Sequence, residues 1–567
     1  SGCSYFMKTG GYDDSRPSAP EDRGALVLKN DWYGDQAARL VYINQNWSPY
    51  DSLWFYYTTQ GSELLSYDYF VNLEQIDNTT RFIDPRNMAR FRFMPQRPTR
   101  NNPEGLPVGI VRNKNYVGFT CAACHTNQIN YKGTGIRVDG APTLANLLAF
   151  LTVLEKTIKA NLDDADKFDR FSRRILGDFY SEGAKTALRA DLGDTLNELS
   201  VYNRRNFSDT KDGFARIDAI GRIFNQAIKF TSGDGFSLPP DAPASYPFIW
   251  DTPQHDWVQW IGLIPNANVG SLARNAGEVI GVFGKVTVEK QDSMIKKVHG
   301  YGSTVEAKNL VELEEWVRRL ASPQWPEAIL PEIDDAKARQ GEALYQRKCV
   351  SCHFLINRSD PKRKIRAQMY GVDLVRTDKT AAHNAVTAVA PTGILEGALM
   401  PLTTEKFGAK APVALITRDL SLGVVTRNKE AAIEAAILAK KHGNGIKALP
   451  KQGEHPEDTD QNPFASLMSY KARPLNGIWA TAPFLHNGSV PTLYDLLLPV
   501  KDRPTRFAVG QREFDPVRVG FKSDPNDPNA PFVFETSKHG NSNSGHLYGV
   551  NLSEAERWAL IEYLKSL

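Results

Sequence analysis

The chain has 567 residues, of which 41% are hydrophobic and 23% are charged, and its formal net charge is +3. This composition is ordinary for a globular protein of about two to four domains and excludes a fibrous or disordered chain. The near balance of 68 basic and 65 acidic residues argues against nucleic acid as the main partner. No run approaches about 18 consecutive apolar residues, which excludes a membrane-spanning helix.

The N-terminal part of the chain divides into a polar segment and an aromatic one. Residues 1–23 are rich in glycine, proline, serine and aspartate, which predicts a flexible segment. Ser1-Gly2-Cys3 resembles the end of a bacterial lipoprotein signal, so Cys3 is a candidate lipidation site that would tether the protein to a membrane surface. An unpaired surface thiol is the alternative. Residues 26–94 are rich in tryptophan, tyrosine and phenylalanine, which we interpret as core packing.

Four of the five cysteines belong to two Cys-x-x-Cys-His motifs, at 121–125 and 349–353. This is the attachment signal for c-type haem, in which two thiols add to the porphyrin vinyl groups and the adjacent imidazole binds the iron. A zinc ribbon needs cysteine pairs about 15–20 residues apart, and a thioredoxin-like pair does not require the histidine. We therefore predict two covalently bound haem c groups, held by Cys121, Cys124, His125, Cys349, Cys352 and His353.

Covalent haem attachment also predicts where the protein works. Thioether formation takes place outside the bacterial cytoplasm, so we expect an exported protein whose signal has been removed. The expected location is periplasmic or secreted, and a lipidated Cys3 would make the protein an outer-membrane lipoprotein.

The spacing of apolar residues predicts several helices. They lie within 143–161, 310–320 and around 431–441, and an amphipathic helix at 334–347 leads into Cys349. Three prolines within 323–331 mark a domain boundary, and Ser553-Glu-Ala-Glu556 is a capping box that begins a C-terminal helix. We therefore expect a mainly α fold with two cytochrome c-like domains, 24–322 and 333–567, that carry long irregular loops and extensions.

The ligand opposite each proximal histidine decides between electron transfer and oxygen chemistry. No methionine follows Met468, so a histidine is expected to complete the second haem. His546 is the preferred candidate, because it lies in a glycine- and serine-rich loop just before the C-terminal helix. His486 is the alternative, and it could instead bind a haem propionate. His442 and His539 are interpreted as structural.

The first haem has no evident sixth ligand, since Met294, His255 and His299 do not lie in a typical ligand loop. The aromatic segment 248–260 could line an apolar pocket or carry electrons between haems, with core packing as the alternative. Polar residues just after it could polarise bound oxygen or act as acid and base. The candidate catalytic residues are Phe248, Trp250, Trp257, Trp260, Arg274, Asn275 and Glu278.

Two Cys-x-x-Cys-His motifs followed by Thr481-Ala-Pro483-Phe-Leu-His486-Asn-Gly-Ser-Val-Pro-Thr-Leu493 resemble the bacterial dihaem cytochrome c peroxidase superfamily. The resemblance covers the chain from about residue 108 onward. It implies that the haem of His125 is the reaction centre and that the haem of His353 transfers electrons. It also implies calcium between the domains, near Thr481 and Pro483.

The great length, the missing late methionine and the aromatic N-terminal region are more similar to the oxygenase branch, which contains rubber oxygenase and dihaem fatty-acid dioxygenase. The Gly545-His546-Leu-Tyr-Gly549 loop resembles the second-haem ligand loop of that branch. The resemblance implies insertion of O₂ into a hydrophobic alkene, either a small molecule such as oleate or polymeric polyisoprene. The alternatives are peroxide reduction with electrons from a small redox protein, and a dihaem electron carrier without enzymatic activity.

Overall fold

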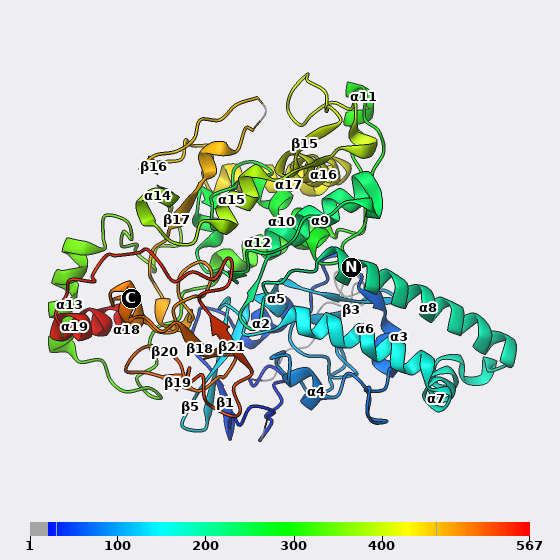
Figure 1. The fold of residues 1–567 in the computed structure, drawn as a ribbon, viewed down its shortest axis with the longest axis horizontal. Helices are drawn as coiled ribbons and strands as arrows, with labels where there is room; N and C mark the ends of the chain where they lie inside the picture. Colours follow the sequence, from blue (N-terminus) through cyan, green and yellow to red (C-terminus); the bar gives the residue numbers. More distant parts are fainter. Residues whose placement is uncertain (1–20, 30, 461) are drawn as a thin grey trace.

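The computed structural model describes residues 21–29, 31–460 and 462–567, so Cys3 and its predicted lipidation lie outside the described residues. About 39% of the chain is helical and 15% is strand, and the strands form separate sheets of two or three strands each (Figure 1). The prediction of a mainly α fold made of two cytochrome c-like domains is therefore wrong, because helices and many small sheets are mixed along the chain.

The strands are short, which is why the sequence pattern did not indicate them. Each contains two to six residues, and alternation of apolar and polar residues over so few positions resembles an irregular loop. One cluster of buried side chains contains residues from both halves of the chain, from Trp47 to Leu564. Cys121 and Cys349 both pack against this cluster. The two haem motifs therefore share one hydrophobic core.

The part of the chain around the first haem motif contains two three-stranded sheets and several short helices. The sheet orders are β1-β6-β5, with β1 parallel to β6, and β2-β4-β3. The helices are α2 (Pro49–Tyr57), α3 (Tyr67–Asn72), α4 (Pro85–Ala89) and α5 (Cys121–Cys124); the strands are β1 (Arg39–Tyr42), β2 (Leu65–Ser66), β3 (Ile110–Asn113), β4 (Tyr116–Phe119), β5 (Thr126–Tyr131) and β6 (Thr134–Asp139).

A hairpin of β5 and β6 begins directly after His125. Its turn consists of Lys132 and Gly133, whose φ angles of 45° and 78° suit a tight hairpin turn and are free of strain in glycine. The hairpin returns the chain to its starting point, where the Gly140 amide donates to the His125 carbonyl at 2.9 Å. The backbone that carries His125 is therefore fixed by a small sheet.

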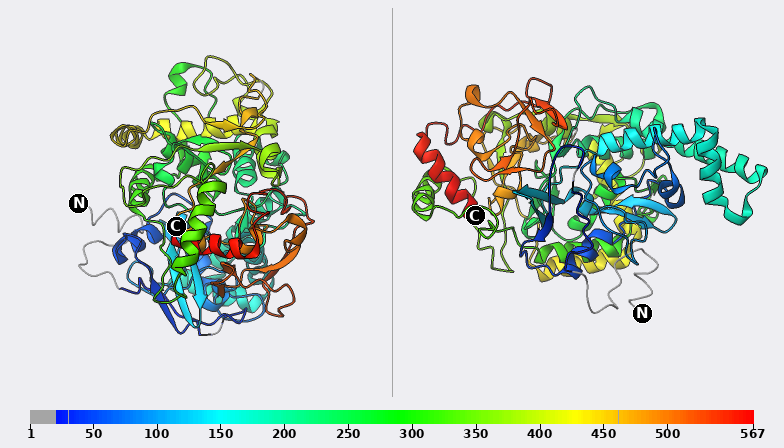
Figure 2. Two further views of the ribbon diagram at one scale, coloured as in Figure 1. Left: turned by 90° about the vertical axis from the view of Figure 1, so that its left-hand side faces the viewer. Right: turned by 90° about the horizontal axis from the view of Figure 1, so that it is seen from below.

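Helices α6 (Leu147–Asp163), α7 (Ala165–Leu176) and α8 (Glu182–Arg205) extend from the molecule at the right of Figure 1 and in the right-hand view of Figure 2. The helix predicted within 143–161 is confirmed as α6 and starts where the Asn146 side chain caps the Ala149 amide. Phe150, Leu151 and Leu154 on its buried face join a second hydrophobic core cluster. These helices form a helical arm.

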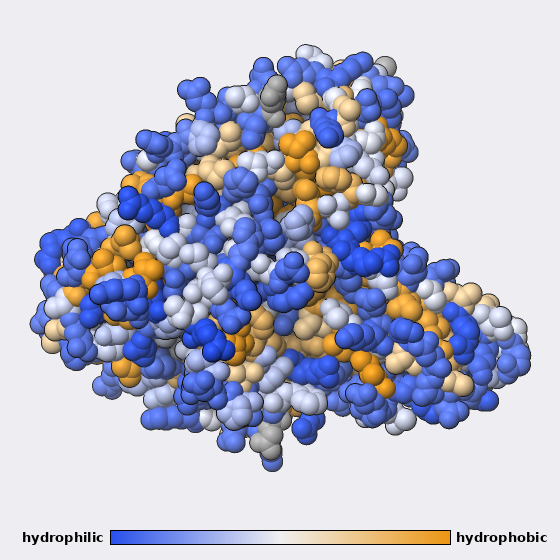
Figure 3. Space-filling model, in the orientation of Figure 1, coloured by the Kyte–Doolittle hydropathy of each residue, from blue (hydrophilic) through white to orange (hydrophobic). Residues whose placement is uncertain are grey.

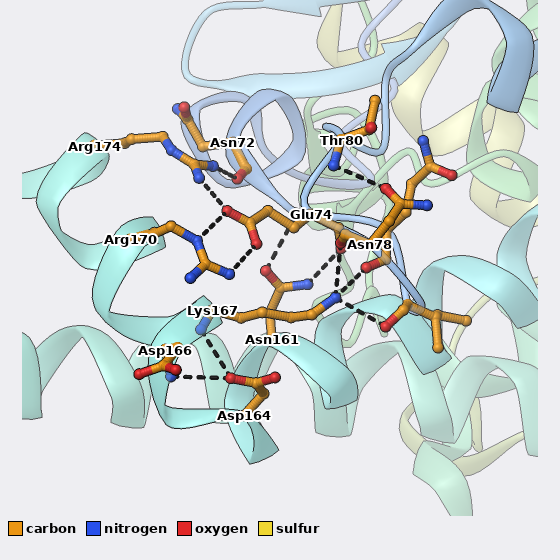
Figure 4. A network of polar contacts seen from close by, with 12 residues as sticks. Asn72, Glu74, Asn78, Thr80, Asn161, Asp164, Asp166, Lys167, Arg170 and Arg174 are labelled. Carbon is orange, nitrogen blue, oxygen red and sulfur yellow. Dashed lines mark hydrogen bonds and ion pairs between the residues drawn. The ribbon is translucent and has the colours of Figure 1, made fainter.

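The helical arm is fastened to the preceding chain by a buried carboxylate, Glu74 (Figure 4). Arg170 donates to its two oxygens at 2.9 and 2.7 Å, and Arg174 donates to it as well. Lys167 donates to the backbone carbonyls of Gln75, Ile76 and Asn78. The Glu74 side chain is fully buried whereas both arginines are partly exposed. The two ion pairs therefore offset the free-energy cost of burying the carboxylate charge.

Glu74→Gln is expected to lower the free energy of unfolding by about 2 kcal/mol, because a neutral amide cannot accept the paired hydrogen bonds of two guanidinium groups. Urea denaturation followed by circular dichroism measures the change. The matched control is Asp163→Asn, which removes an exposed ion pair with Lys159 and should cost about 0.5 kcal/mol or less. An equal loss from the two variants would contradict the role of Glu74.

A bundle of helices covers the first haem motif from above in Figure 1. It consists of α9 (Ala219–Ser232), α10 (Gly270–Gly281), α12 (Ala307–Arg319), α16 (Val413–Arg427) and α17 (Lys429–Lys441). The helices predicted at 310–320 and 431–441 are confirmed as α12 and α17. The smaller elements between them are β7 (Arg216–Ile217), β8 (Ala244–Ser245), β9 (Trp257–Val258), β10 (Ile264–Pro265), β11 (Val286–Thr287), α11 (Met294–Lys297) and β12 (Gly302–Ser303).

The second haem motif follows α13 (Asp335–Lys348), which packs against α19 (Glu554–Ser566) at the left of Figure 1. Both helices confirm the sequence predictions, and the Ser553 capping box is present. Gly341 permits the crossing, because a Cβ atom there would lie 2.0 Å from the Ala559 carbonyl oxygen. The crossing brings Tyr345 of α13 and Tyr563 of α19 to a centroid distance of 5.3 Å.

The remaining elements form small sheets and short helices between α13 and α19. They are β13 (Gln368–Gly371), α14 (Val372–Val375), α15 (Thr380–Thr387), β14 (Val389–Pro391), β15 (Lys410–Pro412), β16 (Lys451–Gln452), β17 (Ser469–Ala472), α18 (Leu493–Leu496), β18 (Arg506–Val509), β19 (Phe514–Asp515), β20 (Gly520–Phe521) and β21 (Phe532–Glu535). Short 3₁₀ turns occur at η1 (Gly177–Phe179), η2 (Gly233–Gly235), η3 (Thr252–Gln254), η4 (Gly393–Leu395), η5 (Ala465–Leu467), η6 (Ile478–Ala480) and η7 (Val500–Asp502).

The proline-rich segment 321–331 is packed against the fold. Trp325 is buried and contacts the rings of Trp479 and Phe514. Among the helices that the structure describes, none is long and apolar enough to cross a membrane. The face shown in Figure 3 is largely hydrophilic, with small separated hydrophobic patches.

Candidate functional site

The first Cys-x-x-Cys-His motif forms a single helical turn, α5, that ends at His125. The His125 Nδ1 atom lies 2.8 Å from the Pro247 carbonyl oxygen, so Nδ1 is the donor and Nε2 is left for a metal. Burial lowers the pKa of His125 to about 4, which keeps the imidazole neutral, as a metal ligand must be. Burial also raises the pKa of Cys121 and of Cys124 to about 12, so neither is a redox-type thiolate.

A cavity of about 80 Å³ lies beside His125. Its walls combine apolar side chains with several acids and bases. The lining residues are Phe55, Cys121, His125, Pro247, Ile249, Thr252, Val258, Gln259, Trp260, Arg274, Asn275, Glu278, Leu313, Glu314, Val317, Lys471 and Arg473. A thiol, a neutral imidazole, an apolar wall and cations that can pair with propionates form a donor set that fits haem c.

Four of the seven predicted catalytic residues line this cavity: Trp260, Arg274, Asn275 and Glu278. Arg274 is held in place by Glu314 and by Asn266, each at 2.5 Å. Three of these four, all except Trp260, lie on α10, where positions 274, 275 and 278 share one face. The helix therefore presents an arginine, an amide and a carboxyl group to one cavity.

The other three predicted residues do not line the cavity. Trp250 is fully buried, stacks on Phe248 with a centroid distance of 4.7 Å and donates to the Asn476 carbonyl. Trp257 donates to the Lys447 carbonyl at 2.9 Å. Phe248 and Trp250 are both buried, as the core-packing alternative describes.

Glu278 is the carboxyl group of the cavity best suited to proton transfer. Burial raises its pKa above the ordinary value, against the opposing influence of Arg274 and of a hydrogen bond from Gln259 at 2.9 Å. A carboxyl group with a raised pKa can release and recover a proton closer to neutral pH. Glu314 also lines the cavity, but its carboxylate accepts a hydrogen bond from Arg274 and is therefore less suited to proton transfer.

Sequence reasoning missed two cations of the cavity, Lys471 and Arg473. Lys471 is buried and donates to the Trp257 carbonyl at 3.0 Å, and burial holds its pKa well below the usual value. Burial lowers the pKa of Arg473 to about 10, so this side chain stays charged at neutral pH. Lys471 lies on β17 and Arg473 directly follows this strand. The available signal was their spacing of two, because alternate residues of an extended segment share one face.

The second Cys-x-x-Cys-His motif lies in a turn after α13. The His353 amide donates to the Cys349 carbonyl at 2.8 Å, and its Nδ1 atom lies 2.6 Å from the Arg473 carbonyl oxygen. Burial lowers the pKa of His353. As in the first motif, a backbone carbonyl fixes the ring and leaves Nε2 for a metal.

The centroids of the His546 and His353 rings lie 6.2 Å apart, and the two ring planes are inclined by 48°. Two imidazoles on opposite sides of one metal would lie about 6 Å apart, since each bond is about 2 Å and each ring adds about 1 Å. The pKa of His546 is lowered to about 3 by burial and by neighbouring His353 and Arg503, so this imidazole is neutral too. The pair fits the two axial positions of a haem.

Arg503 holds the loop that carries His546. Its guanidinium donates to the carbonyls of Asn543 at 2.7 Å, Gly545 at 3.0 Å and His546 at 3.2 Å. The competing candidate, His486, is stacked on Tyr470 with a centroid distance of 3.9 Å. The structure therefore brings His546, and not His486, into ring contact with His353.

The predicted calcium ligands remain a prediction. The Thr481 hydroxyl donates to the Ile478 carbonyl at 2.8 Å, and Pro483 follows in the adjoining turn. Within the described parts of the chain, no group of three or more histidine, cysteine, aspartate or glutamate residues could hold a metal ion.

Comparison of the sequence with known proteins identifies relatives of the chain. A family model described as RoxA-like, cytochrome c-like matches residues 469–508. The uncharacterized protein y4iJ of Sinorhizobium fredii is 30% identical over 597 residues, covering 93% of each chain. The chain belongs to the y4iJ family. The uncharacterized protein y4iM of the same organism is 24% identical over 374 residues, covering 64% of this chain and 70% of y4iM.

The cytochrome c-like match includes residues that lie near both Cys-x-x-Cys-His motifs. It begins at Ser469 and includes Lys471 and Arg473, which line the cavity of His125, as well as the Arg473 carbonyl that accepts from His353. The chain is thus related to RoxA-like cytochromes c, and this relationship supports covalently bound haem c as its cofactor.

Proposed function

We propose that this protein is an exported dihaem c-type oxygenase that inserts O₂ into a hydrophobic alkene. The observation that carries the proposal is the difference between the two proximal histidines. His353 faces a second imidazole, whereas His125 faces a cavity in which no other described lining residue is a histidine or methionine. An open iron position allows oxygen chemistry, and a doubly ligated iron stores electrons.

The residues around His125 are suited to such a reaction. Haem at this site would supply the redox chemistry and an open position for O₂. Phe55, Ile249 and Val258 exclude water and favour an apolar substrate. Arg274, fixed by Glu314, places a positive charge at the wall, and Glu278 can hold or release a proton. Oleate and polyisoprene are the substrates that we propose.

A second candidate function is reduction of hydrogen peroxide with electrons from a small redox protein. The specific observation in its favour is the pairing of Arg274 with Glu278 on one face of α10. An arginine and a proton-exchanging carboxyl group at one cavity are what cleavage of peroxide to water requires.

The haem content and the spectrum of the purified protein test the proposal. We expect two haems per chain, and one in each of the double variants Cys121→Ser/Cys124→Ser and Cys349→Ser/Cys352→Ser, as measured by the pyridine haemochrome assay. The ferric wild type should contain one low-spin and one high-spin haem, and oleate or polyisoprene should cause O₂ uptake. Two low-spin haems without O₂ uptake would indicate an electron carrier and overturn the proposal.

A further inference from the structure

The segment 469–476 runs alongside the segment 247–260, and the two are joined by side-chain and backbone contacts. The Lys471 amide donates to the Trp260 carbonyl at 2.8 Å, and Trp250 Nε1 donates to the Asn476 carbonyl at 2.9 Å. Asn476 in turn donates to Asp251 at 2.6 Å. The contacts lie between the two Cys-x-x-Cys-His motifs, and we call this contact region the seam.

Three hydrogen bonds in the seam connect the two proximal histidines. The first is from His125 Nδ1 to the Pro247 carbonyl. The second is from Arg473 Nη2 to the carbonyl of the next residue, Phe248, at 2.9 Å, with the guanidinium 3.5 Å above the Phe248 ring. The third is from His353 Nδ1 to the Arg473 carbonyl. The Arg473 side chain therefore bonds to the residue next to the carbonyl that holds His125, and the Arg473 carbonyl holds His353.

We propose that Arg473 is a positioning residue shared by both haem sites, through which the state of one haem affects the other. Arg473 lines the first cavity, and its backbone carbonyl accepts from His353, the proposed proximal ligand of the second haem. The inference rests on the proposed dihaem arrangement and goes beyond it, because it names the residue that couples the two centres.

The side chain and the backbone of Arg473 act on the two haems in different ways. A positive charge at the wall of the first cavity opposes oxidation of that haem, because oxidation adds positive charge. The carbonyl that accepts from His353 makes this imidazole a stronger donor, which favours the oxidised second haem. Loss of the contact with Phe248 would loosen the backbone at 473 and weaken the His353 bond.

The test is a spectroelectrochemical titration of the intact dihaem protein. In Arg473→Met we expect the midpoint potential of the first haem to fall and that of the second to rise. Arg473→Lys keeps the charge but lacks the planar fork of arginine, so the first potential should stay close to wild type while the second still rises. The low-spin electron paramagnetic resonance signal of the second haem should shift in both variants.

The matched control is Arg274→Met, because Arg274 lines the same cavity but bonds to Glu314 and Asn266 rather than to the seam. This control should lower the first potential and leave the second haem unchanged. The proposal is overturned if the Arg473 variants leave the second haem unchanged, or if Arg274→Met moves it equally. If Arg473→Met fails to fold, Arg473→Lys decides. A wild type with fewer than two haems would instead contradict the proposed function.

Discussion

Replacement of His546 by alanine is expected to convert the second haem from a six-coordinate, low-spin centre to a five-coordinate, high-spin one. The ring of His546 lies 6.2 Å from that of His353, the separation that two ligands of one iron require. Removing one imidazole leaves that axial position open, and loss of a strong ligand changes the spin state. Electron paramagnetic resonance of the ferric protein measures the change, and added imidazole should restore the low-spin signal.

His486→Ala is the matched control for this experiment. His486 is also buried and also has a pKa lowered by burial, to about 4, but its ring is stacked on Tyr470. We expect this variant to retain the low-spin signal of the second haem. A low-spin signal that survives in His546→Ala and disappears in His486→Ala would reverse the assignment of the two histidines.

The proposed haem-attachment residues can be recognised in the sequence because their chemistry is local. The two thiols and the imidazole of each motif lie within five consecutive residues, so no knowledge of the fold is needed to recognise them. The helices α6, α12, α13, α17 and α19 were predicted for a similar reason, since each is long enough to repeat its apolar spacing. The capping box at Ser553 even located the start of α19.

The fold class could not be predicted in the same way. Two strands of these sheets pair with distant segments, β1 with β6 and β2 with β4, and such pairing leaves no mark in a short stretch of sequence. The hairpin after His125 carried one signal, the turn at Lys132 and Gly133, which the prediction of a mainly α fold disregarded.

The residues that line the cavity could likewise be predicted from the sequence only in part. Arg274, Asn275 and Glu278 were predicted together because they share one helix face. Lys471 and Arg473 reach the same cavity from a segment about 200 residues away, and only the fold brings them there. Phe248 and Trp250 were predicted to line the pocket, yet their aromatic character cannot distinguish a pocket wall from the core behind it.

Glu278→Gln is expected to separate the two candidate reactions. Reduction of hydrogen peroxide to two water molecules consumes two protons and two electrons, whereas insertion of O₂ into a C=C bond to give two carbonyl groups consumes neither. A glutamine cannot exchange protons, so peroxide turnover should fall by about 10²- to 10⁴-fold, the usual contribution of acid–base catalysis. O₂ uptake with oleate or polyisoprene should persist. An oxygen electrode and a peroxide assay measure both rates.

The pH dependence supplies an independent check on the same residue. Burial raises the pKa of Glu278, so its carboxylate, the form that accepts a proton from peroxide, is lost as the pH falls through this raised value. Peroxide turnover of the wild type should therefore decline at a higher pH than an ordinary glutamate would cause, and the decline should be absent in Glu278→Gln. Glu312→Gln, an exposed position on α12, should leave both rates and the pH profile intact.

If Glu278→Gln reduced both rates equally, Glu278 would act on a step common to both reactions, such as the placement of Arg274, and not as the proton donor and acceptor.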